Sequence, residues 1–273
     1  MSEKFEIETD SLTELERKFH QVLMVNELFA GKGAYELQHA KLGQSGYSFG
    51  PIQWDLSQRT EARRNFKRIL LTVGSFSKNE LGEIMSKVKR SGAKLNKEQI
   101  KKINEALSSP RGKQIIEELY LKELKKNINR IEEVIEEVAK AEYRDFLDST
   151  VAKLFLLDYH NQFDISSGGE MEKFLAGEEV TIGKGRRVQV EESLGLGDLL
   201  NFYFNTYYGQ KQPQDLIRRF NNVLAQVEVE NLKLAEDDFK QIARVLSDQR
   251  ELIFAAGTER ALASLMRRAT RWA

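Results

Sequence analysis

Apolar residues recur at spacings of three and four through most of this chain, and no other feature limits its fold class as strongly. This spacing places apolar side chains along one face of an α-helix. Only three prolines interrupt the pattern, at positions 51, 110 and 213. Because proline breaks a helix interior but suits its first turn, we expect long uninterrupted helices. The sequence therefore predicts a mainly α-helical protein.

Several of the expected helices have recognisable starts. The first begins at Asp10 or Ser11, where Ser11 and Glu14 fit a capping box, and runs toward Phe29. One or two long helices opened by Pro110 occupy roughly 110–142, and their apolar stripe fits packing along a core or between lobes rather than a coiled-coil seam. Four more helices are expected toward the C-terminus, at about 197–208, 213–226, 236–256 and 258–272.

One stretch has the sequence pattern of β-strands. Residues 178–190 contain two short runs rich in valine and isoleucine on either side of Gly183-Lys184-Gly185, which predicts a β-hairpin. The glycines are too few for a phosphate-binding fingerprint, so they are interpreted as turn residues. This is the only convincing strand pattern in the chain. We expect a single domain over residues 1–273 with two lobes, in which roughly 75–142 forms a helical insertion or the second lobe.

Composition excludes several kinds of chemistry. The chain has no cysteine, which excludes thiolate nucleophiles, disulfides and iron–sulfur clusters. Three histidines make a metal site improbable, although a carboxylate site for magnesium or calcium stays open, and no cofactor is expected. Lys and Arg equal Asp and Glu at 42 each, so global charge does not favour nucleic acid as a partner. No window suits a membrane span or a signal peptide, which predicts cytoplasmic synthesis.

The segment from Gly31 to Asp55 is the most unusual in composition, because Gly, Ser, Tyr, Phe, Pro and Trp are concentrated there while charge is sparse. Such a segment offers flat apolar faces beside hydrogen-bonding groups, which is what sugar rings require. Glu36 lies near its start, between Tyr35 and Leu37. If apolar neighbours bury Glu36, its pKa rises, as a general acid for a glycosidic oxygen requires. The alternative is a solvated surface glutamate.

Two strings carry a family resemblance. Glu36 is followed 17 residues later by the glutamine of Ser48-Phe49-Gly50-Pro51-Ile52-Gln53, and this spacing resembles the catalytic stretch of goose-type lysozymes and lytic transglycosylases in the lysozyme superfamily. Downstream, residues 156–163 (Leu-Leu-Asp-Tyr-His-Asn-Gln-Phe) resemble the group's tyrosine- and asparagine-containing helix. The chain departs from the family pattern in three ways: Pro51 replaces a leucine, Asp158 and His160 flank Tyr159, and the two strings lie unusually far apart.

The resemblance implies a lysozyme-like fold, which by the convention for that fold is called α+β, and roles for particular residues. Glu36 would be the catalytic acid and base, and Gln53 would contact Glu36 or the sugar. Ser45 or Ser48 would bind the N-acetyl or peptide-bearing sugar, and Tyr159 and Asn161 would form the far wall. Tyr47 is a further candidate substrate contact, although packing roles remain open for Tyr47, Gln53 and Tyr159.

The reaction type depends on a second carboxylate, for which Asp55, Asp158 and Asp164 are candidates, since hydrolysis through a water or nucleophile uses two. Asp55 and Asp158 are also expected among the substrate-binding residues. Asp55 fits equally as a helix cap near Ser57. With Glu36 alone, a muramyl C6 hydroxyl or a water would attack C1, so hydrolase and lytic transglycosylase both stay open.

The sequence thus predicts a muramidase that cleaves the β-1,4 bond between N-acetylmuramic acid and N-acetylglucosamine in peptidoglycan. It would act as a phage endolysin or an exported antibacterial effector, with an immunity protein or export machinery as possible partners. A non-catalytic helical binding protein and a chitin- or chitosan-type glycosidase are the alternatives. Two basic runs, around 59–68 and 267–272, are interpreted as solvated helix faces or as surfaces for an anionic wall or nucleic acid.

Overall fold

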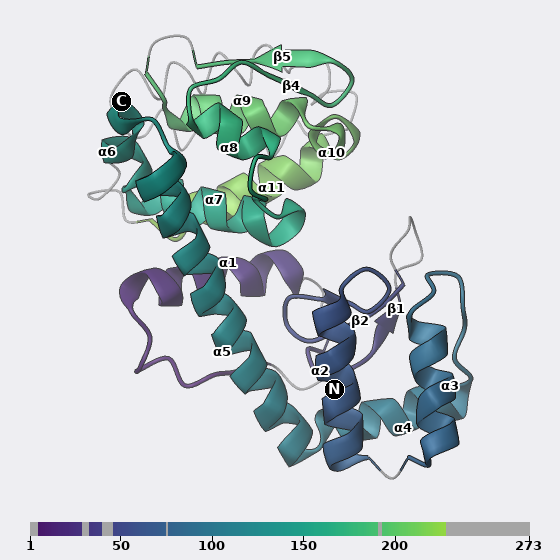
Figure 1. Ribbon diagram of the computed structural model, residues 1–273. Helices are drawn as coiled ribbons and strands as arrows, with labels where there is room; N and C mark the ends of the chain where they lie inside the picture. The colour runs from purple at the N-terminus through teal and green to yellow at the C-terminus, as the bar shows by residue number, and fades with distance from the viewer. Residues whose placement is uncertain (1–4, 29–32, 40–45, 75, 191–192, 228–273) are drawn as a thin grey trace. The chain divides into compact units, whose positions relative to one another are not determined.

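The computed structural model describes residues 5–28, 33–39, 46–74, 76–190 and 193–227. Over these residues the chain is mainly helical, which confirms the predicted fold class (Figure 1). The chain divides into two compact units. Among the described residues, the first combines those up to Leu12 with those of Leu23–Lys125, and the second combines Thr13–Val22 with those from Lys126 onward. One boundary between them falls within α5 (Pro110–Glu133), so the segment of roughly 75–142 contributes to both units.

The first helix, α1 (Glu14–Glu27), has a capping box, but not the predicted one. The Glu16 N–H donates to Thr13 Oγ1 at 3.3 Å, and the Thr13 N–H donates to Glu16 Oε2 at 2.7 Å. The assignment of the box to Ser11 and Glu14 was therefore wrong. Thr13-x-x-Glu16 satisfies the same Ser/Thr-x-x-Glu pattern two residues later, and the helix takes that start.

Three further helices build the first unit: α2 (Thr60–Val73), α3 (Lys78–Val88) and α4 (Lys97–Ser108). Asn96 and Gln99 form a capping box on α4, and the Ser77 side chain accepts from the Glu80 N–H on α3. The buried face of α2 contacts both α3 and α4, and includes Phe66, Ile69 and Leu70. The next helix, α5, begins at Pro110, as the sequence predicted.

A small antiparallel sheet lies in the first unit, where the sequence predicted none. Its strands follow the order β1 (Gln38–His39), β2 (Tyr47–Phe49) and β3 (Trp54–Asp55). Gln38 pairs with Ser48, and Phe49 pairs with Trp54. The prediction of a single β-hairpin was therefore wrong. Strands of two or three residues are too short to show the alternation by which strands are recognised.

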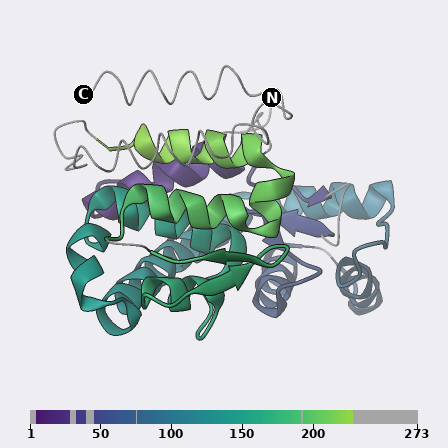
Figure 2. The same ribbon diagram turned by 90° about the horizontal axis from the view of Figure 1, so that it is seen from above.

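The second unit continues from α5 through a π-turn, Val134–Val138, in which the Ala139 N–H donates to the Val134 carbonyl at 2.9 Å. The predicted hairpin is present as β4 (Val180–Ile182) and β5 (Arg186–Val188). Figure 2 shows this hairpin against α9 (Leu196–Asn205), with α11 (Pro213–Leu224) beyond it. The remaining elements are a 3₁₀ turn at Ala141–Tyr143, α6 (Arg144–Leu147), α7 (Thr150–Phe163), α8 (Glu170–Leu175) and α10 (Tyr207–Lys211).

The core of the second unit is aromatic. Phe155 on α7 contacts Tyr203 of α9 and Phe220 of α11 edge to face, at centroid distances of 5.7 and 6.0 Å. Phe174 of α8 packs against Phe202 at 4.9 Å. The helices expected at 197–208 and 213–226 correspond to α9, α10 and α11, whereas those at 236–256 and 258–272 lie outside the described residues. In the described part of the chain, no helix has both the length and the apolar character to cross a membrane.

Candidate functional site

Glu36 lies in a tight turn just before β1, within the first unit. Its own N–H donates to the Gly33 carbonyl at 3.2 Å, and its side chain folds back over the Gly33 α-carbon. A Cβ placed on Gly33 would lie 3.3 Å from Glu36 Cδ, so this close approach favours glycine at position 33. Glu36 itself is half-buried, and it lies in a turn outside any helix.

Both neighbours of Glu36 are held by side chains of distant helices. The Tyr35 hydroxyl donates to Glu117 of α5 at 2.8 Å, and the Leu37 N–H donates to Asn104 Oδ1 of α4 at 2.8 Å. The Tyr35 ring is buried, with Lys113 Nζ above it at 5.4 Å from the centroid. One hydrogen bond therefore anchors the side chain of Tyr35 and the other anchors the backbone of Leu37, so both neighbours of Glu36 are held in place.

The β2–β3 hairpin lies beside this turn. The Gly50 N–H donates to the Ala34 carbonyl at 3.1 Å, which joins the hairpin to the backbone two residues before Glu36. Gly50 has a φ of +79°, and a Cβ there would lie 2.3 Å from the Trp54 ring, so the position requires glycine. The structure thus brings together the two segments that the resemblance paired, those of Glu36 and Gln53.

Gln53 is in a strained conformation at the end of the turn between β2 and β3. Its φ is +54°, a region that costs a residue with a side chain of order 1–3 kcal/mol. Its Oε1 accepts from the Ser48 hydroxyl at 2.9 Å, and its own N–H donates to the Gly50 carbonyl at 3.2 Å. The two half-buried candidates, Ser48 and Gln53, therefore form one polar pair across the hairpin, whereas Ser45 lies outside the described residues.

Two other candidates of this segment have structural partners. The Tyr47 hydroxyl accepts from the Leu95 N–H at 2.9 Å, and the Tyr47 side chain is buried. Asp55 Oδ1 accepts from the Ser57 N–H at 2.7 Å, the Ser57 hydroxyl at 2.6 Å and the Gln58 N–H at 3.1 Å. Tyr47 thus anchors the loop before α4, and Asp55 holds the turn after β3, while a substrate contact of either residue stays a prediction.

Tyr159 belongs to a pocket that lies within the second unit and has a volume of about 690 Å³. Its walls carry four aromatic rings: Tyr159, Phe163, Tyr207 and Tyr208. Phe163 is 37% exposed and Tyr207 is 63% exposed, although both are large apolar residues. Burial, and then the nearby Glu170 carboxylate, raise the pKa of the Tyr159 hydroxyl, so it stays protonated.

The pocket is also lined by polar side chains: Asp164, Ser166, Glu170, Thr206, Lys211 and Gln212. Asp164, a candidate second carboxylate, has a φ of +61°. Within the described ranges, Gln53 and Asp164 are the only residues other than glycine with a positive φ. Asp164 Oδ1 lies 3.4 Å from His160 Nδ1, but that nitrogen accepts from the Ile165 N–H and so carries no proton of its own.

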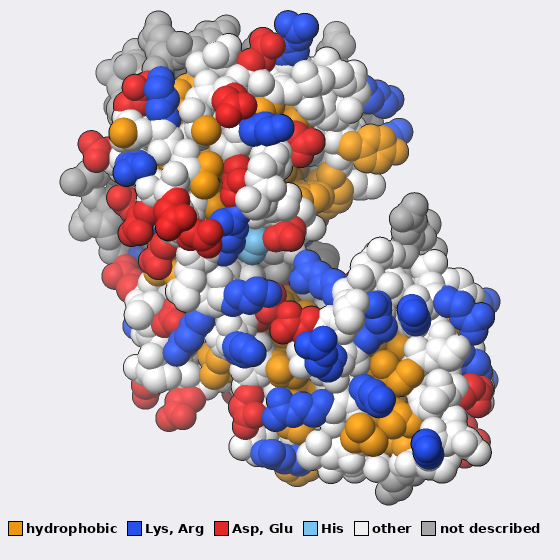
Figure 3. Space-filling model, in the orientation of Figure 1, with side chains coloured by type: hydrophobic (Ala, Val, Ile, Leu, Met, Phe, Trp, Pro, Cys, Tyr) orange, Lys and Arg blue, Asp and Glu red, His pale blue; other side chains and the backbone are white. Residues whose placement is uncertain are grey.

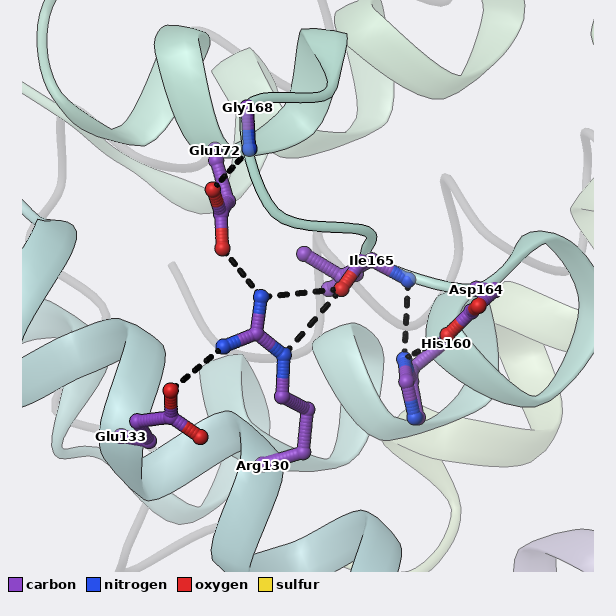
Figure 4. Close-up of polar contacts among 7 residues, drawn as sticks. All are labelled: Arg130, Glu133, His160, Asp164, Ile165, Gly168 and Glu172. Atoms are coloured by element: carbon purple, nitrogen blue, oxygen red, sulfur yellow. Dashed lines mark hydrogen bonds and ion pairs between the residues drawn. The ribbon is translucent and has the colours of Figure 1, made fainter.

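One arginine fixes the loop that forms a wall of this pocket (Figure 4). Arg130 donates to the Ile165 carbonyl from Nε at 3.2 Å and from Nη2 at 3.1 Å, and it also pairs with Glu172 and Glu133. Glu172 in turn accepts from the Gly168 N–H at 2.6 Å. The loop between α7 and α8 is therefore tied at both ends, so the pocket is largely preformed.

Asp158 does not take the substrate-binding role that was expected. It is 2% exposed, and its two oxygens accept from Arg219 Nη2 at 2.8 Å and Nε at 2.9 Å. In the orientation that satisfies both neighbours, the Gln162 amide oxygen also accepts from Arg219 while its nitrogen donates to the Tyr203 hydroxyl. Asp158 is thus part of a buried ion pair, and Asn161 is half-buried on α7.

The sequence reasoning missed most of the pocket. It named Tyr159 and Asp164 as candidates, but it did not single out Phe163 or Glu170. Tyr159 and Phe163 are four residues apart, and this spacing places two rings on one helix face.

No group of three or more potential metal ligands occurs among the residues described. Comparisons with models of protein families, with characterised proteins and with solved structures give no match.

Proposed function

We propose that this protein is a glycosidase that cleaves the β-1,4 bond between N-acetylmuramic acid and N-acetylglucosamine in peptidoglycan, with Glu36 as its acid and base. The observation that carries the proposal is the hydrogen bond between the Gly50 N–H and the Ala34 carbonyl. Because of it, the turn of Glu36 and the hairpin of Ser48 and Gln53 form one local structure. Those are the residues that the resemblance to goose-type lysozymes and lytic transglycosylases assigns to one site.

The chemistry needs one proton donor and one nucleophile. Glu36 as a carboxylic acid gives its proton to the glycosidic oxygen, and the bond from that oxygen to C1 breaks. The oxygen of a water molecule or of the muramyl C6 hydroxyl then bonds to C1, and Glu36 as a carboxylate takes the proton that this oxygen loses. Asp55 is bound to the turn that follows β3, so the proposal assigns the acid and base steps to Glu36 alone.

The aromatic pocket of the second unit supports a carbohydrate substrate. Sugar C–H faces pack on aromatic rings, while their hydroxyls and amides need polar groups around the edge. Tyr207 and Phe163 supply exposed ring faces, and Glu170, Lys211 and Gln212 supply acceptors and donors. A volume of about 690 Å³ lies within the usual range for small-molecule sites.

The test is the turnover of purified sacculi by the parent protein and by Glu36→Gln, which keeps the shape of the side chain but has no proton to donate. Glu118→Gln, an exposed glutamate on α5, is the matched control. We expect Glu118→Gln to release muropeptides at the parental rate and Glu36→Gln to lose at least a hundredfold. Equal rates for the two variants, or no release by the parent, contradict the proposal.

The product identifies the reaction. Mass spectrometry of the released muropeptides distinguishes a 1,6-anhydro end from a reducing end, because the two differ by one water. A panel with chitin and chitosan oligomers separates muramidase activity from glycosidase activity on those polymers. Action as a phage lysin or as an exported effector belongs to the same proposal, and cleavage of sacculi is required for either.

A non-catalytic glycan-binding protein is the second candidate, favoured by the preformed pocket on the second unit. It predicts that Tyr207→Ala abolishes binding to sacculi while Glu36→Gln leaves binding unchanged and neither protein cleaves. Leu71→Ala is the control for the tyrosine variant, because Leu71 is also 63% exposed and lies on α2.

A further inference from the structure

The charge of this neutral chain is unevenly distributed. Residues 46–125 contain 17 Lys and Arg against nine Asp and Glu, which gives this stretch a formal charge of +8. All of these residues belong to the first unit. Between residues 84 and 97 there are five basic residues and no acidic one, and between 56 and 79 there are six basic residues and one acid, Glu61.

The two basic stretches meet in the structure. A Cβ on Gly46 would lie 3.1 Å from Ser57 Cβ and 3.2 Å from the Ser91 α-carbon, so the segment before α2 and the segment after α3 are neighbours. The Tyr47–Leu95 hydrogen bond holds the second of these segments in place. The basic residues nearest this junction, Arg59 and Arg90, therefore lie on neighbouring segments of the chain.

We call the following residues the basic surface: Arg59, Arg64, Lys67 and Arg68 on and before α2, and Lys89, Arg90 and Lys94 on the segment after α3. All seven are exposed. In the part of the chain that the structure describes, none of the seven forms an ion pair. Figure 3 shows Lys and Arg side chains spread over the face of α2, α3 and α4.

The helical spacing makes this surface continuous along α2. Arg64, Lys67 and Arg68 lie three and four residues apart, on the side opposite the buried Ala62, Phe66, Ile69 and Leu70. Like charges so close together repel one another, and a polyanion removes that cost. Arginine is the side chain best shaped for phosphate oxygens, and four of the seven residues are arginines.

We propose that the basic surface binds the phosphodiester polymers attached to peptidoglycan, and so holds the enzyme on the wall that it cleaves. This inference rests on the proposed function, which supplies the wall as the place of action. Several weak contacts to a flexible chain of phosphates allow the protein to move along the wall, because no single contact fixes its position.

Binding is measured with Glu36→Gln protein, so that the wall is not consumed. The protein is sedimented with sacculi that keep their phosphodiester polymers and with sacculi stripped of them by acid, over a range of salt concentrations. We expect stripping to weaken binding at least tenfold in low salt. The triple change Arg64→Gln, Lys67→Gln and Arg68→Gln should weaken binding to intact sacculi similarly, and should make log K fall less steeply with log salt, by about two.

The matched control removes the same charge elsewhere, through Lys122→Gln, Lys125→Gln and Lys173→Gln, which are all exposed. If the control triple weakens binding as much as the test triple, only net charge matters and the basic surface is not a site. Equal binding to stripped and intact sacculi overturns the proposal. So does binding of a single-stranded oligonucleotide as tight as that of the wall polymer, because the surface would then be a nucleic-acid site.

Failure of this inference is distinct from failure of the proposed function. Cleavage of stripped sacculi by the parent protein depends on Glu36 and not on the basic surface. A protein that cleaves stripped sacculi but binds intact and stripped sacculi equally refutes the inference alone. A protein that binds the phosphodiester polymer but releases no muropeptide refutes the glycosidase.

Discussion

Replacing Asp158 by asparagine decides whether this residue holds the fold or binds substrate. The Asp158 and Arg219 side chains are each 3% exposed, and two hydrogen bonds of 2.8 and 2.9 Å join them. Asp158→Asn leaves the Arg219 guanidinium buried without its counter-charge. Breaking a buried pair in this way costs about 3–5 kcal/mol. At about 2–4 °C per kcal/mol for a chain of this size, the melting temperature falls by about 10 °C.

The assay is urea unfolding followed by far-ultraviolet circular dichroism, with two comparison variants. Asp215→Asn breaks the Arg218 pair, whose side chains are 30% and 31% exposed, so the expected cost is below about 1 kcal/mol. The double change Asp158→Leu and Arg219→Met replaces both charges by apolar groups and should recover most of the stability. A loss of less than 1 kcal/mol in Asp158→Asn, together with lost glycan binding, would refute the structural role.

Three further predictions follow from single contacts. Burial lowers the pKa of His20 to about 4, so between about pH 6.5 and pH 4 the unfolded chain binds a proton that the folded chain does not. The unfolding free energy should therefore fall by about 3 kcal/mol as the pH drops through that window. Urea unfolding at each pH measures this loss, which His20→Gln should not show. Tyr47→Phe leaves the Leu95 N–H without its acceptor and should cost about 1–2 kcal/mol, with faster hydrogen exchange at Leu95. Asp164→Gly removes the positive-φ strain and should raise the unfolding free energy by about 1 kcal/mol, and unchanged stability would mean that the turn is relaxed.

The sequence predicted the elements whose signal is local. Pro110 opens α5, and the glycines at 183 and 185 mark the turn of the β4–β5 hairpin, with φ values of +55° and +80°. The start of α1 was missed by two residues because Ser11 and Thr13 each have a glutamate three positions on. Only the folded chain distinguishes between two equivalent caps, and it uses Thr13 with Glu16.

The site was less accessible to sequence reasoning, because its contacts join residues far apart in the chain. Tyr47 and its partner are 48 residues apart, and Asp158 and Arg219 are 61 residues apart. No residue near Asp158 in the sequence indicates that the Arg219 guanidinium will pair with it. The β1–β2–β3 sheet was missed for another reason, because strands of two or three residues show almost no sequence pattern of their own.

The two hydrogen bonds beside Glu36 have a consequence for the order in which the contacts around this residue form during synthesis. Their partners are Asn104 and Glu117, which lie 67 and 82 residues further along the chain than Leu37 and Tyr35. A nascent polypeptide, or a fragment cut ahead of α4, carries Glu36 but lacks the partners of Tyr35 and Leu37. The full set of contacts around Glu36 therefore forms only after α4 and the first turns of α5 have been synthesised and packed.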